Sequence, residues 1–325
     1  MELTGEQMVN QESFRSFYNR ELHPLLAQTE ARRKSVQQWA YAMYIAIAIA
    51  AIVVLIMFGS GASPNAGVAI PIAAAIITGW VYTDKKEKFA NEYKLAIISK
   101  IVQFVSPGCD YSPTHHISET DYNNSNLHRR EYDRFNGEDY FEGRHQRTDF
   151  YCSELHTEYK TTDSKGRTSW HTIFRGLFFV ADFNKNFSGG TYVWGDGHAE
   201  VSSTMIGRFF SSFSRQVERV ELEDPEFEHY FDVYSTDQVE ARYILSPSLM
   251  QRMVNLRQKM NCLMECSFVQ SKMYMSFPLS NDLFEPGIHR ANDNFETAWS
   301  YVSEFGLFFE IIDELNLNNR IWTKQ

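Results

Sequence analysis

Hydrophobic residues dominate one long stretch near the beginning of the chain. Between Ser35 and Thr83 the sequence contains no Asp, Glu, Lys or Arg. Two apolar runs, residues 40–58 and 66–82, are separated by a loop of glycine and small polar residues. Each run is close to the roughly 20 residues that a helix needs to cross the hydrocarbon core of a bilayer. The pattern predicts a hairpin of two transmembrane helices, and the alternative is a buried helical hairpin of a soluble protein.

Helical periodicity continues on both sides of the apolar runs. Apolar residues recur three and four positions apart from Phe14 to Leu26, and again from Phe89 to Phe104. This spacing predicts two amphipathic helices that pack together. Pro24 lies inside the first of them and should kink it or divide it into two pieces. Residues 1–106 are therefore expected to form one helical module whose middle lies in the membrane.

The charged residues next to the apolar runs indicate the orientation of the hairpin. Arg32, Arg33 and Lys34 precede the first run and three lysines follow the second, whereas the connecting loop carries no charge. By the positive-inside rule, both ends of the chain should face the cytoplasm. Residues 1–34 are polar and too long for the basic start of a signal peptide, so we do not expect cleavage.

After a connector at residues 107–137, the period of the apolar positions changes to two. Such alternation predicts β-strands, and we expect about seven, beginning near Glu138, Phe150, Thr168, Thr191, Val217, Glu265 and Lys272. Residues 138–325 should form a cytosolic, mainly antiparallel β domain with inserted helices and a C-terminal helix, which makes the chain an α+β protein. This count is that of a pleckstrin-homology-like barrel, and a two-layer α+β sandwich fits it almost as well.

The densest group of titratable side chains lies on the hairpin expected from the second and third strands. If Thr162 pairs with Arg167 across the turn, one face of the hairpin carries Glu154, His156, Glu158 and His171. Imidazoles and carboxylates can bind a transition metal or transfer protons, so one hypothesis is a metal-dependent or acid/base hydrolase. The other, which we favour, is an exposed ladder of opposite charges that supports the strand register.

Composition and motifs narrow the classes of function. The formal net charge of −10, without a stripe of basic residues, opposes nucleic-acid binding. The chain has no zinc-type spacing of cysteines, and we expect reduced thiols at Cys109, Cys152, Cys262 and Cys266. It also lacks a phosphate-binding loop and the common hydrolase motifs, so we assign no cofactor and no catalytic residue. A membrane-anchored binding or scaffold module fits these features best.

Six segments of the sequence carry a family resemblance: residues 154–160, 170–174, 176–185, 222–228, 233–245 and 316–322. Together with the apolar hairpin, they resemble the DUF3137 family of bacterial membrane proteins. The resemblance implies two N-terminal spans in the inner membrane, a cytosolic domain and a membrane-protein partner. It implies no reaction and supplies no catalytic residue. The sequence departs from the family pattern mainly around residues 191–214.

Overall fold

The computed structural model describes residues 10–60, 66–128, 130–183, 188–195, 217–315 and 317. The loop residues 61–65 and most of the segments 191–214 and 316–322, which entered the sequence analysis, lie outside this part. The chain divides into two compact units, one made of residues 1–105 with 284–303 and the other of residues 106–283 with 304–325. The helix α10 (Phe295–Glu314) contributes its first part to one unit and its remainder to the other.

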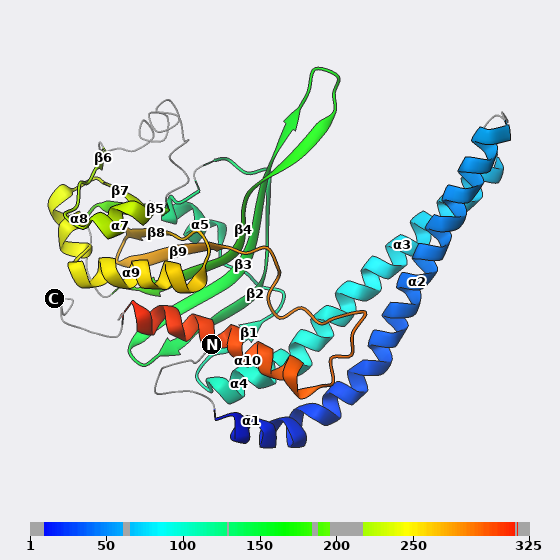
Figure 1. Ribbon diagram of the computed structural model, residues 1–325, viewed down its shortest axis with the longest axis horizontal. Helices are drawn as coiled ribbons and strands as arrows, with labels where there is room; N and C mark the ends of the chain where they lie inside the picture. The colour runs from blue at the N-terminus through cyan, green and yellow to red at the C-terminus, as the bar shows by residue number, and fades with distance from the viewer. Residues whose placement is uncertain are drawn as a thin grey trace. The chain divides into compact units, whose positions relative to one another are not determined.

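Two long helical stretches form the first unit. The first stretch consists of α1 (Gln11–Phe17), the π-helix η1 (Tyr18–Leu22) and α2 (His23–Ser60). The second consists of α3 (Ala66–Tyr93), the π-helix η2 (Lys94–Ile98) and α4 (Ser99–Val105). The helices α2 and α3 run side by side as a hairpin (Figure 1). The two amphipathic helices expected from the periodicity are therefore continuous with the two apolar helices.

A π-helical turn accommodates the proline in the first stretch. Pro24 has no N–H group and cannot donate to the carbonyl four residues earlier. Just before it, the N–H of His23 donates to the carbonyl of Tyr18, five residues earlier. This wider turn separates α1 from α2 without ending the helix. The expected kink or division at Pro24 is therefore replaced by a change of hydrogen-bond spacing within a continuous helical stretch.

A segment from the C-terminal half of the sequence completes the core of the helical unit. Phe14 packs against Phe104 and against Trp299, with ring centroids 5.6 and 5.4 Å apart. Lys94 is fully buried, and its ammonium lies 2.7 Å from the carboxylate of Glu285. Burying a charge is costly unless it is paired. This ion pair therefore helps to hold residues 284–303 in the helical unit. The periodicity of residues near the N-terminus gives no sign of these contacts.

An open antiparallel sheet of nine strands lies at the centre of the second unit (Figure 1). The strands are β1 (Asp110–Ser112), β2 (Arg134–His145), β3 (Thr148–Thr162), β4 (Thr168–Asp182), β5 (Gly190–Gly195), β6 (Glu218–Arg219), β7 (Phe231–Ser235), β8 (Glu265–Val269) and β9 (Lys272–Pro278). Their order in the sheet is β1-β2-β3-β4-β9-β8-β5-β7-β6. The α+β class is confirmed.

The expectation of a closed barrel is wrong. A barrel requires its first and last strands to pair, but β1 and β6 stand at opposite edges of the sheet and are three and two residues long. Two strands that the sequence did not predict, β1 and β7, also change the topology. The first lies in the expected connector, and β7 separates two of the helices that were expected as an insertion.

Among the described residues, four shorter helices accompany the sheet: α5 (Glu119–Ser125), α7 (Pro225–Tyr230), α8 (Gln238–Ile244) and α9 (Pro247–Met260). Asp224 and Ser246 cap the N-termini of α7 and α9, as their positions before a proline indicate. The cap of α8 is Asp237, whose side chain accepts two backbone hydrogen bonds. Ser235 instead ends β7. The spacing of Ser235 and Gln238 predicts a capping box, and this prediction is wrong because Asp237 is the cap.

The two faces of the sheet are covered by different elements. On one face, Phe141 of β2 packs against Phe305 and Phe308 of α10, with ring centroids 5.4 Å apart in each case. On the other face, α5 and the residues around it form a core with β3, β4 and β9, in which Tyr122 and Tyr274 are buried. The connector is therefore ordered and packed. It covers part of its face and leaves the rest accessible.

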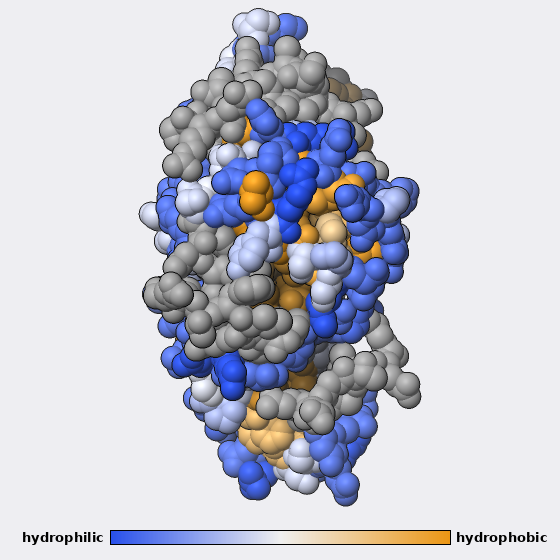
Figure 2. All heavy atoms as spheres, turned by 90° about the vertical axis from the view of Figure 1, so that its left-hand side faces the viewer, coloured by the Kyte–Doolittle hydropathy of each residue, from blue (hydrophilic) through white to orange (hydrophobic). Residues whose placement is uncertain are grey.

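Hydrophilic residues predominate on the described surface shown in Figure 2, with apolar residues visible between them. The large apolar side chains that are exposed in the described residues are instead concentrated on α2 and α3. Nine of them lie between Tyr41 and Phe58, and five lie between Ile70 and Trp80. The surface of the α2–α3 hairpin is therefore more apolar than the described surface of the sheet unit.

Candidate functional site

The β3–β4 hairpin, which carries the predicted site, closes with a tighter turn than expected. Thr162 pairs with Thr168 rather than with Arg167. The N–H of Asp163 donates to the carbonyl of Arg167 at 2.9 Å, and the N–H of Gly166 donates to the carbonyl of Asp163 at 3.0 Å. Gly166 has a φ of +76°, which a glycine adopts without strain. A three-residue loop of this kind shifts the register by one residue from the prediction.

This shift places His171 on the opposite face from its expected partners. His171 pairs with Tyr159, and the two rings stack with centroids 4.9 Å apart. Glu158 pairs with Thr172 instead. A slip of one residue turns a side chain to the other face of the sheet. The predicted pairing of Glu158 with His171 is therefore wrong, and the tight glycine turn is the reason.

The other three candidates share one face of β3 but lie in different surroundings. His156 Nε2 lies 3.2 Å from Thr172 Oγ1 and 3.8 Å from a carboxylate oxygen of Glu158. Glu154 is buried, with 7% of its surface exposed, and accepts a hydrogen bond from the N–H of Leu283. The register of β3 with β4 is interrupted between Thr157 and Glu158, beyond both Glu154 and His156. In the described part of the chain, the four candidates do not gather their ligand atoms around one point.

Glu154 belongs instead to a cluster of three carboxylates with Glu138 and Asp139 of β2. One oxygen from each side chain lies within 4.8 Å of the other two. The register of β2 is interrupted between Glu138 and Phe141, and Asp139 has a φ of +57°. Asp139 is buried and accepts a hydrogen bond from the hydroxyl of Tyr111. Oxygen ligands at this spacing can share a proton or hold a hard cation such as Mg²⁺ or Ca²⁺.

The protonation of this cluster follows from its burial. Loss of hydration raises the pKa of Glu154 to about 9, and the nearby carboxylates of Asp139, Asp282 and Glu138 act in the same direction. The hydrogen bond from Leu283 acts against this rise and is outweighed. A carboxyl group with such a pKa is neutral at pH 7 and can donate a hydrogen bond. Glu154 therefore carries a proton inside the sheet unit at neutral pH.

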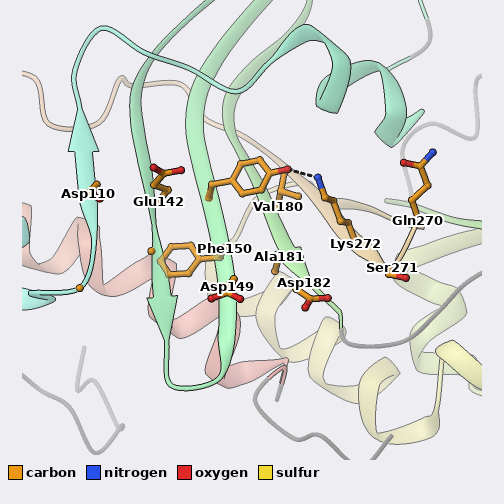
Figure 3. Close-up of a pocket in the computed structure, with 13 residues that line it drawn as sticks. Asp110, Glu142, Asp149, Phe150, Val180, Ala181, Asp182, Gln270, Ser271 and Lys272 are labelled. Atoms are coloured by element: carbon orange, nitrogen blue, oxygen red, sulfur yellow. Dashed lines mark hydrogen bonds between the residues drawn. The ribbon is translucent and has the colours of Figure 1, made fainter. Parts of the chain in front are cut away.

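A cavity of about 530 Å³ opens where α5 leaves its face of the sheet uncovered (Figure 3). This volume is typical of small-molecule sites, which range from about 300 to 1,000 Å³. Tyr151 and Val180 pair across β3 and β4 and form part of the lining. The acidic residues of the lining are Asp110, Glu142, Asp149 and Asp182.

Of the described residues that line the cavity, one is basic, Lys272 of β9. Its ammonium donates to the hydroxyl of Tyr151 at 2.8 Å, the dashed line in Figure 3. It also forms an ion pair with Asp121 of α5 at 3.0 Å. The lysine is therefore directed toward the side of the cavity where α5 lies, and the balance of charge in the lining is negative.

Sequence reasoning missed both the carboxylate cluster and the cavity. Asp110 lies in the expected connector, where no strand was predicted. The acidic residues of the cavity come from four strands, and no local pattern indicates that they converge. One signal was available. Asp149 directly precedes the strand predicted from Phe150, and Asp182 lies near the end of the strand predicted from Thr168. Antiparallel pairing of these two strands brings such positions close together.

The fold defines an α+β protein that combines a unit with two long apolar helices and a unit with an open antiparallel sheet. Residues 172–317 match the family described as "Protein of unknown function (DUF3137)". The match begins within β4 and extends past the end of α10, and it confirms, over these residues, the resemblance seen in the sequence. No curated protein and no solved structure matches the chain.

Proposed function

We propose that the protein is a two-pass membrane protein in which the α2–α3 hairpin anchors a binding module. The observation that carries this proposal is the exposure of the apolar helices. Both are long and apolar enough to cross a membrane, and none of the most apolar part of either helix is buried. Phe58 is 85% exposed, Trp80 73% and Leu55 70%. The core helix of a soluble protein would bury such side chains, so the exposure opposes that alternative.

The free energy at stake supports a membrane environment. Burying one large apolar side chain is worth about 1.5–3 kcal/mol. Fourteen large side chains are exposed along the two helices, nine on the first and five on the second. Their combined contribution exceeds the roughly 5–15 kcal/mol that stabilises a whole domain. A lipid bilayer supplies the apolar surroundings that these side chains lack in water.

The orientation follows from the charges at the open end of the hairpin. The ammonium of Lys85 lies 5.9 Å from the ring of Trp39, so the beginning of the first span and the end of the second lie at one level. The basic residues Arg32 to Lys34 and Lys85 to Lys88 belong to this end. By the positive-inside rule this end faces the cytoplasm. Both termini are then cytoplasmic, in the inner membrane of a bacterium.

The sheet unit is the binding part of this proposal. Its support is the cavity, which combines an apolar lining with a few charged groups in the manner of ligand sites. The hydrolase alternative has less support, because His171 lies on the opposite face of the hairpin from Glu158. A role as a scaffold in a membrane-protein complex is the part of the proposal that rests on the family resemblance.

Cysteine labelling tests the membrane topology. Ser63→Cys lies in the loop between the apolar runs and Ser13→Cys lies in α1. A membrane-impermeant maleimide should label Ser63→Cys in intact spheroplasts. It should label Ser13→Cys only after the spheroplasts are lysed. The unsubstituted chain controls for the four native cysteines. Labelling of Ser13→Cys in intact spheroplasts, or release of the protein from membranes at alkaline pH, would contradict the proposal.

A further inference from the structure

We propose that two copies of the chain associate through an uncovered strand edge of the β3–β4 hairpin and form a symmetric dimer. The surface is the outer edge of β4 between Thr168 and Thr172, which we call the free edge. The inference goes beyond the proposed function, and it rests on that function only because the membrane anchor brings the copies together. Its support is the direction of the backbone groups along the free edge and a sequence that complements itself.

The free edge belongs to an arm of the hairpin that extends beyond the other strands of the sheet unit (Figure 1). The pairing of β4 with β9 begins at Gly176, and the last backbone bond toward the arm runs from the N–H of Leu279 to the carbonyl of Arg175. In the part of the chain that the structure describes, no strand pairs with residues 168–174 on this side. Residues 168–172 are all exposed, so a second strand can reach this edge.

The backbone groups of the free edge point away from β3. On the far side of the arm, the carbonyl of Glu158 accepts a hydrogen bond from the N–H of Asp133 at 2.8 Å, and the N–H of Lys160 donates to the carboxylate of Asp133 at 2.7 Å. Glu158 and Lys160 therefore direct their backbone groups away from β4, where their register partners are Thr172 and Trp170. In an antiparallel ladder, the residues of a pair that is not hydrogen-bonded both direct these groups outward. Trp170 and Thr172 therefore present their N–H and C=O groups to the free edge.

The β3 edge of the arm is protected, whereas the free edge is not. Unpaired strand edges attract other strands, and natural proteins cover them or place charged residues or proline there. Asp133 covers the β3 edge with both of its bonds. The free edge and the two residues after it, positions 168–174, contain no Asp, Glu, Lys, Arg or Pro. Alternation along the strand adds the backbone groups of Thr168 to this edge, which can therefore accept a further strand.

The sequence of the free edge complements itself in one antiparallel register, in which Trp170 lies on the two-fold axis. Thr168 then pairs with Thr172 of the second copy, Ser169 pairs with His171, and Trp170 pairs with its own copy. The three outward-facing residues of each strand would exchange about six backbone hydrogen bonds. No charged residues meet, and aromatic rings opposite each other on neighbouring strands stabilise the pairing. This symmetry favours a second copy over an unrelated peptide, because each contact is made twice.

Trp170 is positioned for this contact by an arginine of β2. The guanidinium of Arg134 lies 3.5 Å from the centroid of the Trp170 ring. A cation over an aromatic face is attracted to it, so the ring is held in place before a partner arrives. The ring still has 37% of its surface exposed. A second tryptophan across the axis would cover part of this surface.

The length of the free edge indicates where the dimer should form. Five residues of a strand span about 17 Å. An interface of this length buries less than the roughly 1,200–2,000 Å² of stable complexes, so pairing between freely diffusing molecules should be weak. Copies anchored in one bilayer meet at a raised effective concentration. We therefore expect the dimer in membranes and expect it to dissociate when lipid is added.

Disulfide trapping of the full-length protein in vesicles of phosphatidylethanolamine and phosphatidylglycerol tests the register. One preparation carries Ser169→Cys, a second carries His171→Cys, and the two are reconstituted alone or together, with the unsubstituted chain as control for the native cysteines. Residues that face each other without bonding lie about 4.5 Å apart at Cα, which suits a disulfide. We expect about tenfold more linked dimer in the mixture than in either preparation alone. Equal amounts in all three, or no linked dimer in the mixture, would overturn the proposal.

Two proline variants separate dimer formation from folding. Thr168→Pro, added to both cysteine preparations, removes an outward N–H from each copy and should lower the linked product about tenfold. The matched control Thr162→Pro changes its register partner, whose N–H faces the other edge of the arm, and should leave the product within about twofold. A thermal melt shows that each variant is folded, and Trp170→Lys, which places two like charges at the axis, is a second disruption. Equal losses in both proline variants would contradict the assignment.

Flotation of the same vesicles reports on the membrane anchor separately. Protein that floats with the vesicles but gives no mixed product would refute the dimer and leave the anchor standing. Protein that does not float would refute the anchor, whichever product forms.

Discussion

Glu154→Gln should change how the stability of the sheet unit depends on pH. The pKa of this carboxyl is about 9 in the folded protein and 4.5 in its ordinary state. Between these values the folded state keeps a proton that the unfolded state has released, so the free energy of unfolding falls as the pH rises. Each pH unit in this window costs about 1.4 kcal/mol. From pH 5 to pH 8 the expected loss is about 4 kcal/mol.

The glutamine variant removes this dependence with little change of shape. Its amide oxygen can still accept the hydrogen bond from the N–H of Leu283. We expect wild type and variant to have similar stability at pH 5, and the variant to be more stable by about 4 kcal/mol at pH 8. Chemical unfolding of the full chain in nonionic detergent at four pH values measures the difference, with the exposed Glu221→Gln as control. Parallel curves for wild type and Glu154→Gln would refute the reasoning about burial.

Two further substitutions test single features of the fold by thermal unfolding. Asp110→Asn removes one charge of the pair with Glu142 and should raise the free energy of unfolding by about 0.2–1 kcal/mol, and a loss of stability would show that the two carboxylates do not repel. Gly166→Ala should lower the free energy of unfolding by about 1–2 kcal/mol, because alanine is strained at positive φ. No neighbouring atom would contact the added methyl group, so an unchanged melting temperature would mean that the turn relaxes to another conformation.

Features with a local cause could be predicted from the sequence. The apolar spans, the helix α10 and the caps at Asp224 and Ser246 follow from periodicity and from side chains that bond nearby backbone groups. The β8–β9 hairpin was also correct, and its turn residues Gln270 and Ser271 both have positive φ. In each case the information lies within a few residues of the element that it specifies.

The failures arise where distant residues or backbone conformation decide the outcome. A turn between Thr162 and Arg167 was expected, but the left-handed conformation of Gly166 set a register one residue away from the expected one. That single step moved His171 to the opposite face from Glu158. The buried pair of Lys94 and Glu285 joins segments that are far apart in the sequence. No spacing rule could have connected them.

The two groups of carboxylates in the sheet unit differ in their contact with water, and this difference decides which of them ions in solution can reach. The group around Glu154 is buried, and loss of hydration keeps that carboxyl protonated at neutral pH. Asp110 and Glu142 are exposed at the edge of a cavity that a ligand can enter. Electrostatic attraction acts on a diffusing cation through charges that solvent can reach. We therefore expect molar salt to reduce the gain in stability from Asp110→Asn and to leave most of the gain from Glu154→Gln at pH 8, and an equal reduction of both would mean that solvent reaches the Glu154 carboxyl.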